Sequence, residues 1–272
     1  MNYQCFNIFS LTKNLWQHKN LIGQLAKREI LARYKGSYLG FFWSFLTPFF
    51  MLAIYTFVFS IIFEARWGMA TGGKVEFAMI LFCGLIVFNI FSESVIKAPG
   101  LIYSNVSYVK KVVFPLEILP VTVIISSLFN GAVSLFVLLF VLIILMGTFH
   151  WTVLFIPIII LPLVMITLGI CWFLASLGVF VRDIGHIVGV AVTGLLFLSP
   201  IFYPISAIPS EIQKLFYVNP ITYIVEDARR VIIWGQQPNW PILGIELAAG
   251  ILIMILGYAW FQKTREGFAD VL

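Results

Sequence analysis

Long apolar segments, separated by short polar ones, dominate this sequence of 272 residues. A helix needs about 20 apolar residues to cross a membrane, because each residue adds about 1.5 Å toward a hydrocarbon core of about 30 Å. The pattern therefore predicts an all-α integral membrane protein with six transmembrane helices. The expected spans cover residues 40–63, 77–96, 118–146, 151–181, 184–202 and 241–261.

The segment before the first span has a different pattern, in which apolar residues recur at helical spacing and polar residues fill the opposite face. It reads NLIGQLAKREILARY from Asn20 to Tyr34, and Asn20 is a residue type that commonly caps a helix. We expect an amphipathic helix that lies on the inner leaflet, with its cations near the lipid phosphates. The alternative is a helix that packs on a partner.

The fifth span runs into a stretch that a continuous helix would not tolerate. Residues 196–209 read LFLSPIFYPISAIP, and the prolines interrupt helical hydrogen bonding. A backbone broken at membrane depth persists only where protein or a water-filled cavity supplies hydrogen-bond partners. Residues 211–218 and 220–233, the latter capped by Asn219, then predict two short helices. We expect a re-entrant hairpin on the outer side, with an ordinary external loop as the alternative.

Composition and charge support the membrane class and suggest an orientation. Hydrophobic residues make up 61% of the chain and charged residues 11%, whereas soluble domains carry about 25% charged residues. Twelve of the 17 lysines and arginines fall on the side that holds both termini, which predicts cytoplasmic termini. Arg229 and Arg230 count among the outer cations. Glu93 with Lys97, and Glu226 with Arg230, are expected to pair along their helices.

Recognisable catalytic chemistry is lacking. Cys5, Cys83 and Cys171 are odd in number and widely spaced, so neither a disulfide framework nor a cysteine-based metal site is expected. The loop Gly68–Val75 resembles a phosphate-binding loop but ends in Val75, which has no hydroxyl for magnesium. We expect no enzyme activity, no metal site, no catalytic residue and no cofactor in this chain.

Three segments resemble, in order and spacing, the signatures of bacterial ABC-transporter permeases that export polysaccharides. They are REILARYKGSYLGFFWSFLTP (28–48), SPIFYP (199–204) and NPITYIVEDARR (219–230). The resemblance covers about residues 10–265 and is strongest to O-antigen permeases. Capsular polysaccharide and teichoic acid exporters belong to the same family and remain alternatives. The rival readings outside the family are a stand-alone channel or secondary transporter, and a membrane-embedded enzyme.

The resemblance implies a homodimer in the bacterial inner membrane, with both termini in the cytoplasm and a channel between the copies. Two copies of a separate ATPase subunit would bind the ATP and magnesium and drive lipid-linked polysaccharide outward. Three regions follow: an amphipathic interfacial segment (1–39), a six-span permease domain (40–262) and a cytoplasmic tail (263–272). Within the permease domain, residues 99–114 would couple to the ATPase, and residues 199–233 would form the re-entrant gate.

Candidate site residues follow from these regions. Aromatic rings can stack on the C–H faces of sugars, so aromatic clusters at the two ends of the path are expected to line the channel, although aromatic residues also form interfacial belts. The channel and gate candidates are Tyr38, Phe41, Phe42, Trp43, Phe197, Ser199, Pro200, Phe202, Tyr203 and Pro204. The candidates for coupling to the ATPase are Tyr103, Tyr108, Val109, Lys110 and Lys111.

Overall fold

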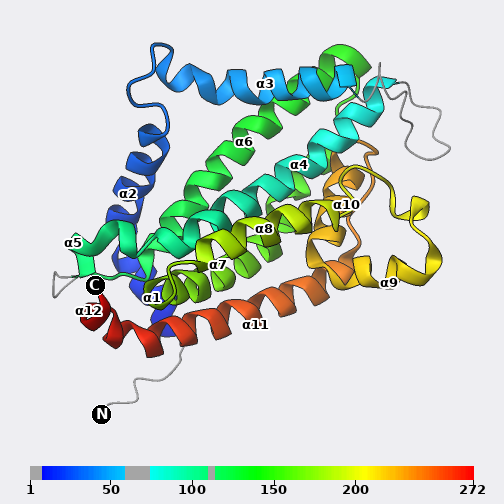
Figure 1. Ribbon diagram of the computed structural model, residues 1–272. Helices are drawn as coiled ribbons and strands as arrows, with labels where there is room; N and C mark the ends of the chain where they lie inside the picture. Colours follow the sequence, from blue (N-terminus) through cyan, green and yellow to red (C-terminus); the bar gives the residue numbers. More distant parts are fainter. Residues whose placement is uncertain (1–7, 59–73, 110–113) are drawn as a thin grey trace.

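The computed structural model describes residues 8–58, 74–109 and 114–272, and all regular structure within these ranges is helical. The long helices run in a bundle, while α2 crosses one end of it (Figure 1). We call the end with α2, α5 and the C-terminus the α2 end, and the end with α9 and α10 the α10 end. The α-helices are α1 (Ile8–Gln17), α2 (Lys19–Ala32), α3 (Trp43–Tyr55), α4 (Lys74–Lys97), α5 (Val106–Val109), α6 (Ile118–Met146), α7 (Ile156–Phe180), α8 (Ile184–Phe197), α9 (Ser210–Val218), α10 (Pro220–Ile232), α11 (Trp240–Thr264) and α12 (Phe268–Val271).

Five helical segments of the described chain are long and apolar enough to cross a membrane. One coincides with the predicted third span, and the first, second and fourth differ from their predictions by a few residues at the ends. The last one continues to Val271, whereas its predicted end was residue 261. Residues 59–63 of the predicted first span lie outside the described residues. The five segments are Gly40–Val58, Val75–Gly100, Ile118–Met146, Trp151–Phe180 and Trp240–Val271.

The fifth predicted span is shorter in the structure. We expected it to reach Phe202, but α8 ends at Phe197 and has 14 residues. A helix of that length covers about 21 Å, less than a hydrocarbon core of about 30 Å. The two short helices expected beyond it are present as α9 and α10, and Asn219 caps α10 by accepting a hydrogen bond from the backbone N–H of Ile221 at 3.0 Å.

The amphipathic helix α2 is present, but its first residue is Lys19 and its N-cap is His18. Asn20 therefore lies inside the helix, and the prediction that it caps the helix is wrong. Ile22 and Leu25 are buried, and they belong to the same apolar cluster as Ile118 of α6. Part of the apolar face of α2 is thus covered by the protein itself rather than by lipid.

Helices α7 and α11 pack at backbone contact because glycines remove the side chains between them. A Cβ atom on Gly257 would lie 2.0 Å from the carbonyl oxygen of Gly169, and one on Gly169 would lie 2.3 Å from that of Ile253. Small residues allow such close approach between helices in membranes. This contact positions α11, whose N-terminus lies at the α10 end.

Replacing Gly257 with alanine should destabilise the bundle, because the added methyl group has no room against the α7 backbone. Overpacking of this kind costs about 1–3 kcal/mol of unfolding free energy. Thermal unfolding in detergent, followed by size-exclusion chromatography, would measure the loss. Gly244→Ala is the matched control, since a Cβ there meets nothing within 4 Å. Equal stability of the two variants would contradict the close packing.

Candidate functional site

The chain leaves the helical path directly after α8. Residues Ser199–Pro204 are not helical, as their prolines predicted. Ser199 is fully buried, and its hydroxyl donates to the carbonyl of Leu195 at 2.7 Å. The same hydroxyl accepts a hydrogen bond from the Asn219 side-chain amide at 2.9 Å. The break in the helix is therefore joined to the start of α10.

Backbone carbonyls of the break accept hydrogen bonds from Arg229 of α10, whose side chain is fully buried. Its Nη1 donates to the carbonyl of Pro200 at 2.8 Å, and its Nη2 donates to that of Ile201 at 3.0 Å. Its Nε donates to the carbonyl of Ile80 in α4 at 3.2 Å. One guanidinium thus holds α4, the break and α10 together.

Glu226 provides the counter-charge, with its Oε2 atom 3.3 Å from Nη1 of Arg229. Glu226 was expected to pair with Arg230, but it pairs with Arg229, so this prediction is wrong. Arg229, which was counted with the cations of the outer side, has its side chain inside the protein. The partners on the same helix are three residues apart rather than four.

Gly84 of α4 leaves the space that the guanidinium occupies. A Cβ atom there would lie 2.9 Å from Nη2 of Arg229 and 3.2 Å from Cγ1 of Val225. The sequence pattern did not reveal the role of Arg229 or of Gly84. A signal was present, since Arg229 continues the helical stripe of buried Ile221 and Val225 on α10, and a cation on an apolar stripe in a membrane protein indicates a specific partner.

The aromatic residues near the break form one cluster. Phe197 is 60% exposed and stacks on Phe202, with ring centroids 5.7 Å apart. The Tyr203 hydroxyl donates to the carbonyl of Phe197, and the Tyr203 ring meets Phe216 edge-on at 6.2 Å. Among the other gate candidates, Ser199 and Pro200 are buried and Pro204 is half-buried.

The second aromatic group lies at the start of α3, away from the break. Phe41 meets Tyr34 edge-on at 6.0 Å and contacts Phe129 of α6 at 5.8 Å. Three further residues of the group are exposed, namely Tyr38, Phe42 and Trp43. The structure therefore keeps the two predicted aromatic groups apart, one beside α2 and one beside α10.

Two ion pairs attach α2 to α4. Arg33 lies 3.0 Å from Glu93, and Lys97 lies 2.7 Å from Glu29. The expected pairing of Glu93 with Lys97 is wrong, because each residue binds α2 instead. Burial lowers the pKa of the Arg33 guanidinium, but the hydrogen bond and charge of Glu93 raise it. The pKa of Arg33 therefore lies above its ordinary value. All four side chains are about a third exposed, so each pair contributes about 1 kcal/mol or less and mainly fixes orientation.

The predicted coupling residues lie at the α2 end. The Tyr108 hydroxyl accepts a hydrogen bond from Arg28 at 2.9 Å, and the Tyr108 ring stacks on Phe114 at 4.3 Å. Tyr103 is half-exposed, and its ring centroid lies 5.2 Å from the guanidinium carbon of Arg182. Val109 is half-buried. Lys110 and Lys111 lie outside the described residues.

The buried carboxylate of Glu117 fixes the end of the predicted coupling loop, residues 99–114. The sequence pattern did not reveal this role. Glu117 accepts hydrogen bonds from Asn14 at 2.5 Å and from Arg265 at 3.0 Å. Arg265 also donates to the carbonyl of Phe114 at 3.2 Å. Phe268, in the predicted tail, is fully buried against Phe261. Residues 263–272 are therefore docked on the bundle beside the loop.

Within the described ranges, no group of three or more His, Cys, Asp or Glu side chains is arranged to hold a metal ion. Cys83 and Cys171 are buried free thiols. Cys5 and most of the Gly68–Val75 loop lie outside the described residues.

Replacing Arg229 with methionine should strongly destabilise the protein, because the buried carbonyls of Pro200 and Ile201 lose their donor. A buried polar group left without a partner costs about 1–3 kcal/mol, so the two together should cost about 2 kcal/mol or more. Gly84→Ala should act in the same direction by displacing the guanidinium. The melting temperature in detergent micelles would report both effects.

The matched control for this prediction is Lys214→Met, which removes an exposed cation from α9. Gly244→Ala serves as the control for Gly84→Ala, because its Cβ would meet nothing within 4 Å. If Arg229→Met melted at the same temperature as Lys214→Met, the guanidinium would not be holding the break.

Comparison with known proteins agrees with this architecture. Residues 20–233 match the family described as ABC-2 type transporter. The chain is similar to the O-antigen export system permease protein RfbA of Myxococcus xanthus, with 29% identity over 263 residues, or 96% of this chain and 98% of that protein. It is 24% identical over 261 residues to a protein of the same name from Klebsiella pneumoniae, covering 95% and 97% of the two chains. The resemblance of the three sequence motifs is thus confirmed, and the chain belongs to the ABC-2 type transporter family.

Proposed function

We propose that this chain is the channel-forming membrane subunit of an ATP-driven ABC exporter that moves lipid-linked polysaccharide of the O-antigen type outward across the inner membrane. The observation that carries the proposal is the similarity to O-antigen export permeases along 96% of the chain. A chain that matches such permeases from end to end has room for the same set of functional elements.

In this proposal two copies form the channel, and the surfaces of α3 and α8 supply the interface. Both helices expose most of their apolar side chains, with only Val188 and Val192 buried on α8. Gly189 on α8 meets nothing within 4 Å, and Thr193 one turn later is exposed. Such a stripe of small residues would let a second copy approach closely.

The α10 end is proposed to face outward, which places both termini in the cytoplasm. Helix α8 would complete a sixth crossing together with the non-helical Ser199–Pro204 segment, and α9 and α10 would form a re-entrant gate. The support is physical: Arg229 and Asn219 supply the hydrogen bonds that a broken backbone needs at membrane depth.

The α2 end is proposed to dock on a separate ATPase, which would bind the ATP and magnesium. Tyr103, Tyr108 and Val109, with the two lysines that follow them, would form the contact. The ion pairs of α2 with α4 and the Glu117–Arg265 pair support this role, because they hold the loop against the long helices. Force applied to the loop would then reach the bundle.

Replacing Tyr108 with alanine should weaken assembly with the partner ATPase subunit. An aromatic anchor at the centre of an interface contributes about 1–2 kcal/mol, so affinity should fall about tenfold. Co-purification and ATP hydrolysis of the complex in nanodiscs would measure this. Phe140→Ala, which removes an exposed ring from α6, is the control. A chain that transports polysaccharide with no ATPase partner would instead favour the stand-alone channel.

Replacing Phe197 with leucine should slow polysaccharide export while leaving ATPase assembly intact. Leucine keeps the apolar contact but loses the ring face on which a sugar can stack, and such stacking contributes about 0.5–1.5 kcal/mol. Polysaccharide appearing on the outer face of cells, normalised to ATPase activity, would show a drop of several-fold. Phe136→Leu on α6, also exposed, should export normally. Equal export by both variants would remove Phe197 from the path.

A further inference from the structure

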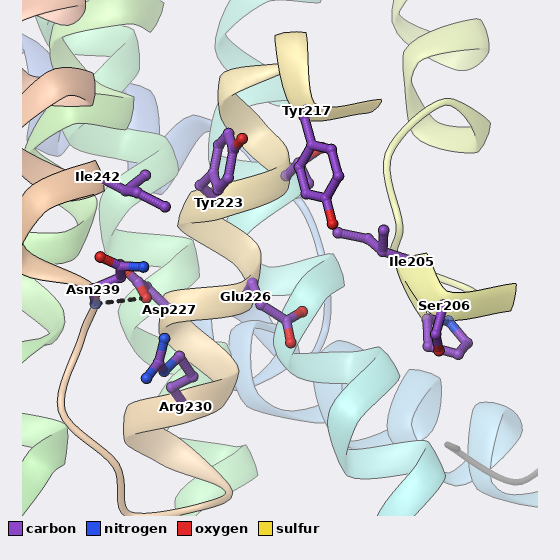
Figure 2. Close-up of a pocket in the computed structure, with 11 residues that line it drawn as sticks. Ile205, Ser206, Tyr217, Tyr223, Glu226, Asp227, Arg230, Asn239 and Ile242 are labelled. Atoms are coloured by element: carbon purple, nitrogen blue, oxygen red, sulfur yellow. Dashed lines mark hydrogen bonds between the residues drawn. The ribbon is translucent and has the colours of Figure 1, made fainter. Parts of the chain in front are cut away.

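A cavity of about 400 Å³ opens beside α10, between the Pro204–Ser206 segment and the start of α11 (Figure 2). Its walls combine aromatic, charged and amide side chains: Tyr217, Tyr223, Glu226, Asp227, Arg230 and Asn239. Its volume falls within the range of about 300–1,000 Å³ that small-molecule sites occupy. It lies among the segments of the proposed re-entrant gate, on α9, α10 and the residues that precede them.

Polar atoms at the cavity wall lack partners. Asp227 is only 3% exposed, and one of its oxygens accepts a hydrogen bond from the backbone N–H of Asn239 at 3.0 Å. The other oxygen, Oδ2, has no hydrogen-bond partner among the described residues, and neither does the buried Nε of Arg230. Buried polar atoms are normally satisfied, so an acceptor and a donor on one cavity wall indicate a ligand that both donates and accepts.

The tyrosines give the cavity an apolar platform. The rings of Tyr217 and Tyr223 lie 5.8 Å apart, with an angle of 27° between their planes. Tyr217 is exposed and Tyr223 half-buried, so part of this pair can be reached from outside. Figure 2 shows Tyr223 and Asp227 on the same helix, with Tyr217 nearby. A ligand could therefore contact ring faces and the carboxylate together.

We propose that this cavity is a binding subsite for one uncharged monosaccharide unit of a glycan. This proposal rests on the function proposed above. A sugar hydroxyl can donate to Asp227 Oδ2 and accept from Arg230 Nε, while the C–H face of the ring lies on a tyrosine. A divalent cation fits less well, because Arg230 lines the wall and the described residues hold no group of three metal-ligating side chains. The carboxylates of Glu226 and Asp227 disfavour an anionic sugar.

The test is saturation-transfer-difference NMR on the purified chain in nanodiscs, with methyl glycosides of mannose, galactose, glucose and rhamnose as probes. At least one probe should bind the wild type. Tyr223→Leu should weaken binding about fivefold, the scale of one aromatic contact, and Asp227→Asn should weaken it at least as much, since a hydrogen bond to a charged group is lost. Tyr223→Phe keeps the ring and should retain binding, which separates loss of stacking from misfolding. Phe140→Leu on α6 is the control.

Polysaccharide export by the same variants, together with their ATPase, separates failure of the subsite from failure of the proposed function. If the complex exports polysaccharide but no glycoside binds, or if Tyr223→Leu binds as the wild type does, the subsite is wrong and the function stands. If the glycosides bind as expected but the complex moves no polysaccharide, the proposed function is wrong and the subsite stands. A glycoside signal that EDTA abolishes and calcium restores would show that a cation mediates the contact, which would overturn direct recognition by Asp227 and Arg230.

Discussion

The three hydrogen bonds from Arg229 to backbone carbonyls are the interaction on which the α10 end depends. A helix broken at Pro200 leaves carbonyls that lipid cannot satisfy, and each would cost about 1–3 kcal/mol. A buried guanidinium without partners would cost several kcal/mol more. The two costs offset each other because each group satisfies the other, at 2.8 Å to Pro200 and 3.0 Å to Ile201. Removing either one restores the cost of the other, so the break and the arginine stabilise the structure only as a pair.

Helix α4 connects the hydrogen bonds of Arg229 to the break, which we call the lock, to the opposite end of the molecule. Ile80 and Gly84 contact Arg229 near one end of the helix, while Glu93 and Lys97 bind α2 near the other. The 14 residues from Ile80 to Glu93 span about 20 Å of continuous helix. Because one buried helix carries both sets of contacts, a displacement of α2 along the bundle would act directly on the lock at the break, with no flexible segment between them.

The sequence predicted the helices well and their polar contacts poorly. Apolar segments marked the long helices because membrane thickness sets their length, and prolines marked the break because they remove hydrogen bonds. Partners were harder to identify. Glu93 and Lys97 share one face of α4, yet each pairs with α2 rather than with the other. Helix α2 crosses the end of the bundle and brings Arg33 to Glu93 and Glu29 to Lys97. Nor could spacing reveal Gly84, whose role depends on a guanidinium more than a hundred residues away.

The position of Glu226 links the lock to the cavity. Its Oε2 lies 3.3 Å from Arg229, and the residue also lines the cavity with Asp227 and Arg230. The Arg229 side chain is fully buried, whereas Glu226 is about a third exposed, so only the carboxylate can respond to what occupies the cavity. A sugar hydroxyl that donated to Glu226 would compete with Arg229 for the same oxygens and weaken the counter-charge of the lock. Occupancy of the cavity and the strength of the lock would then be coupled through one carboxylate.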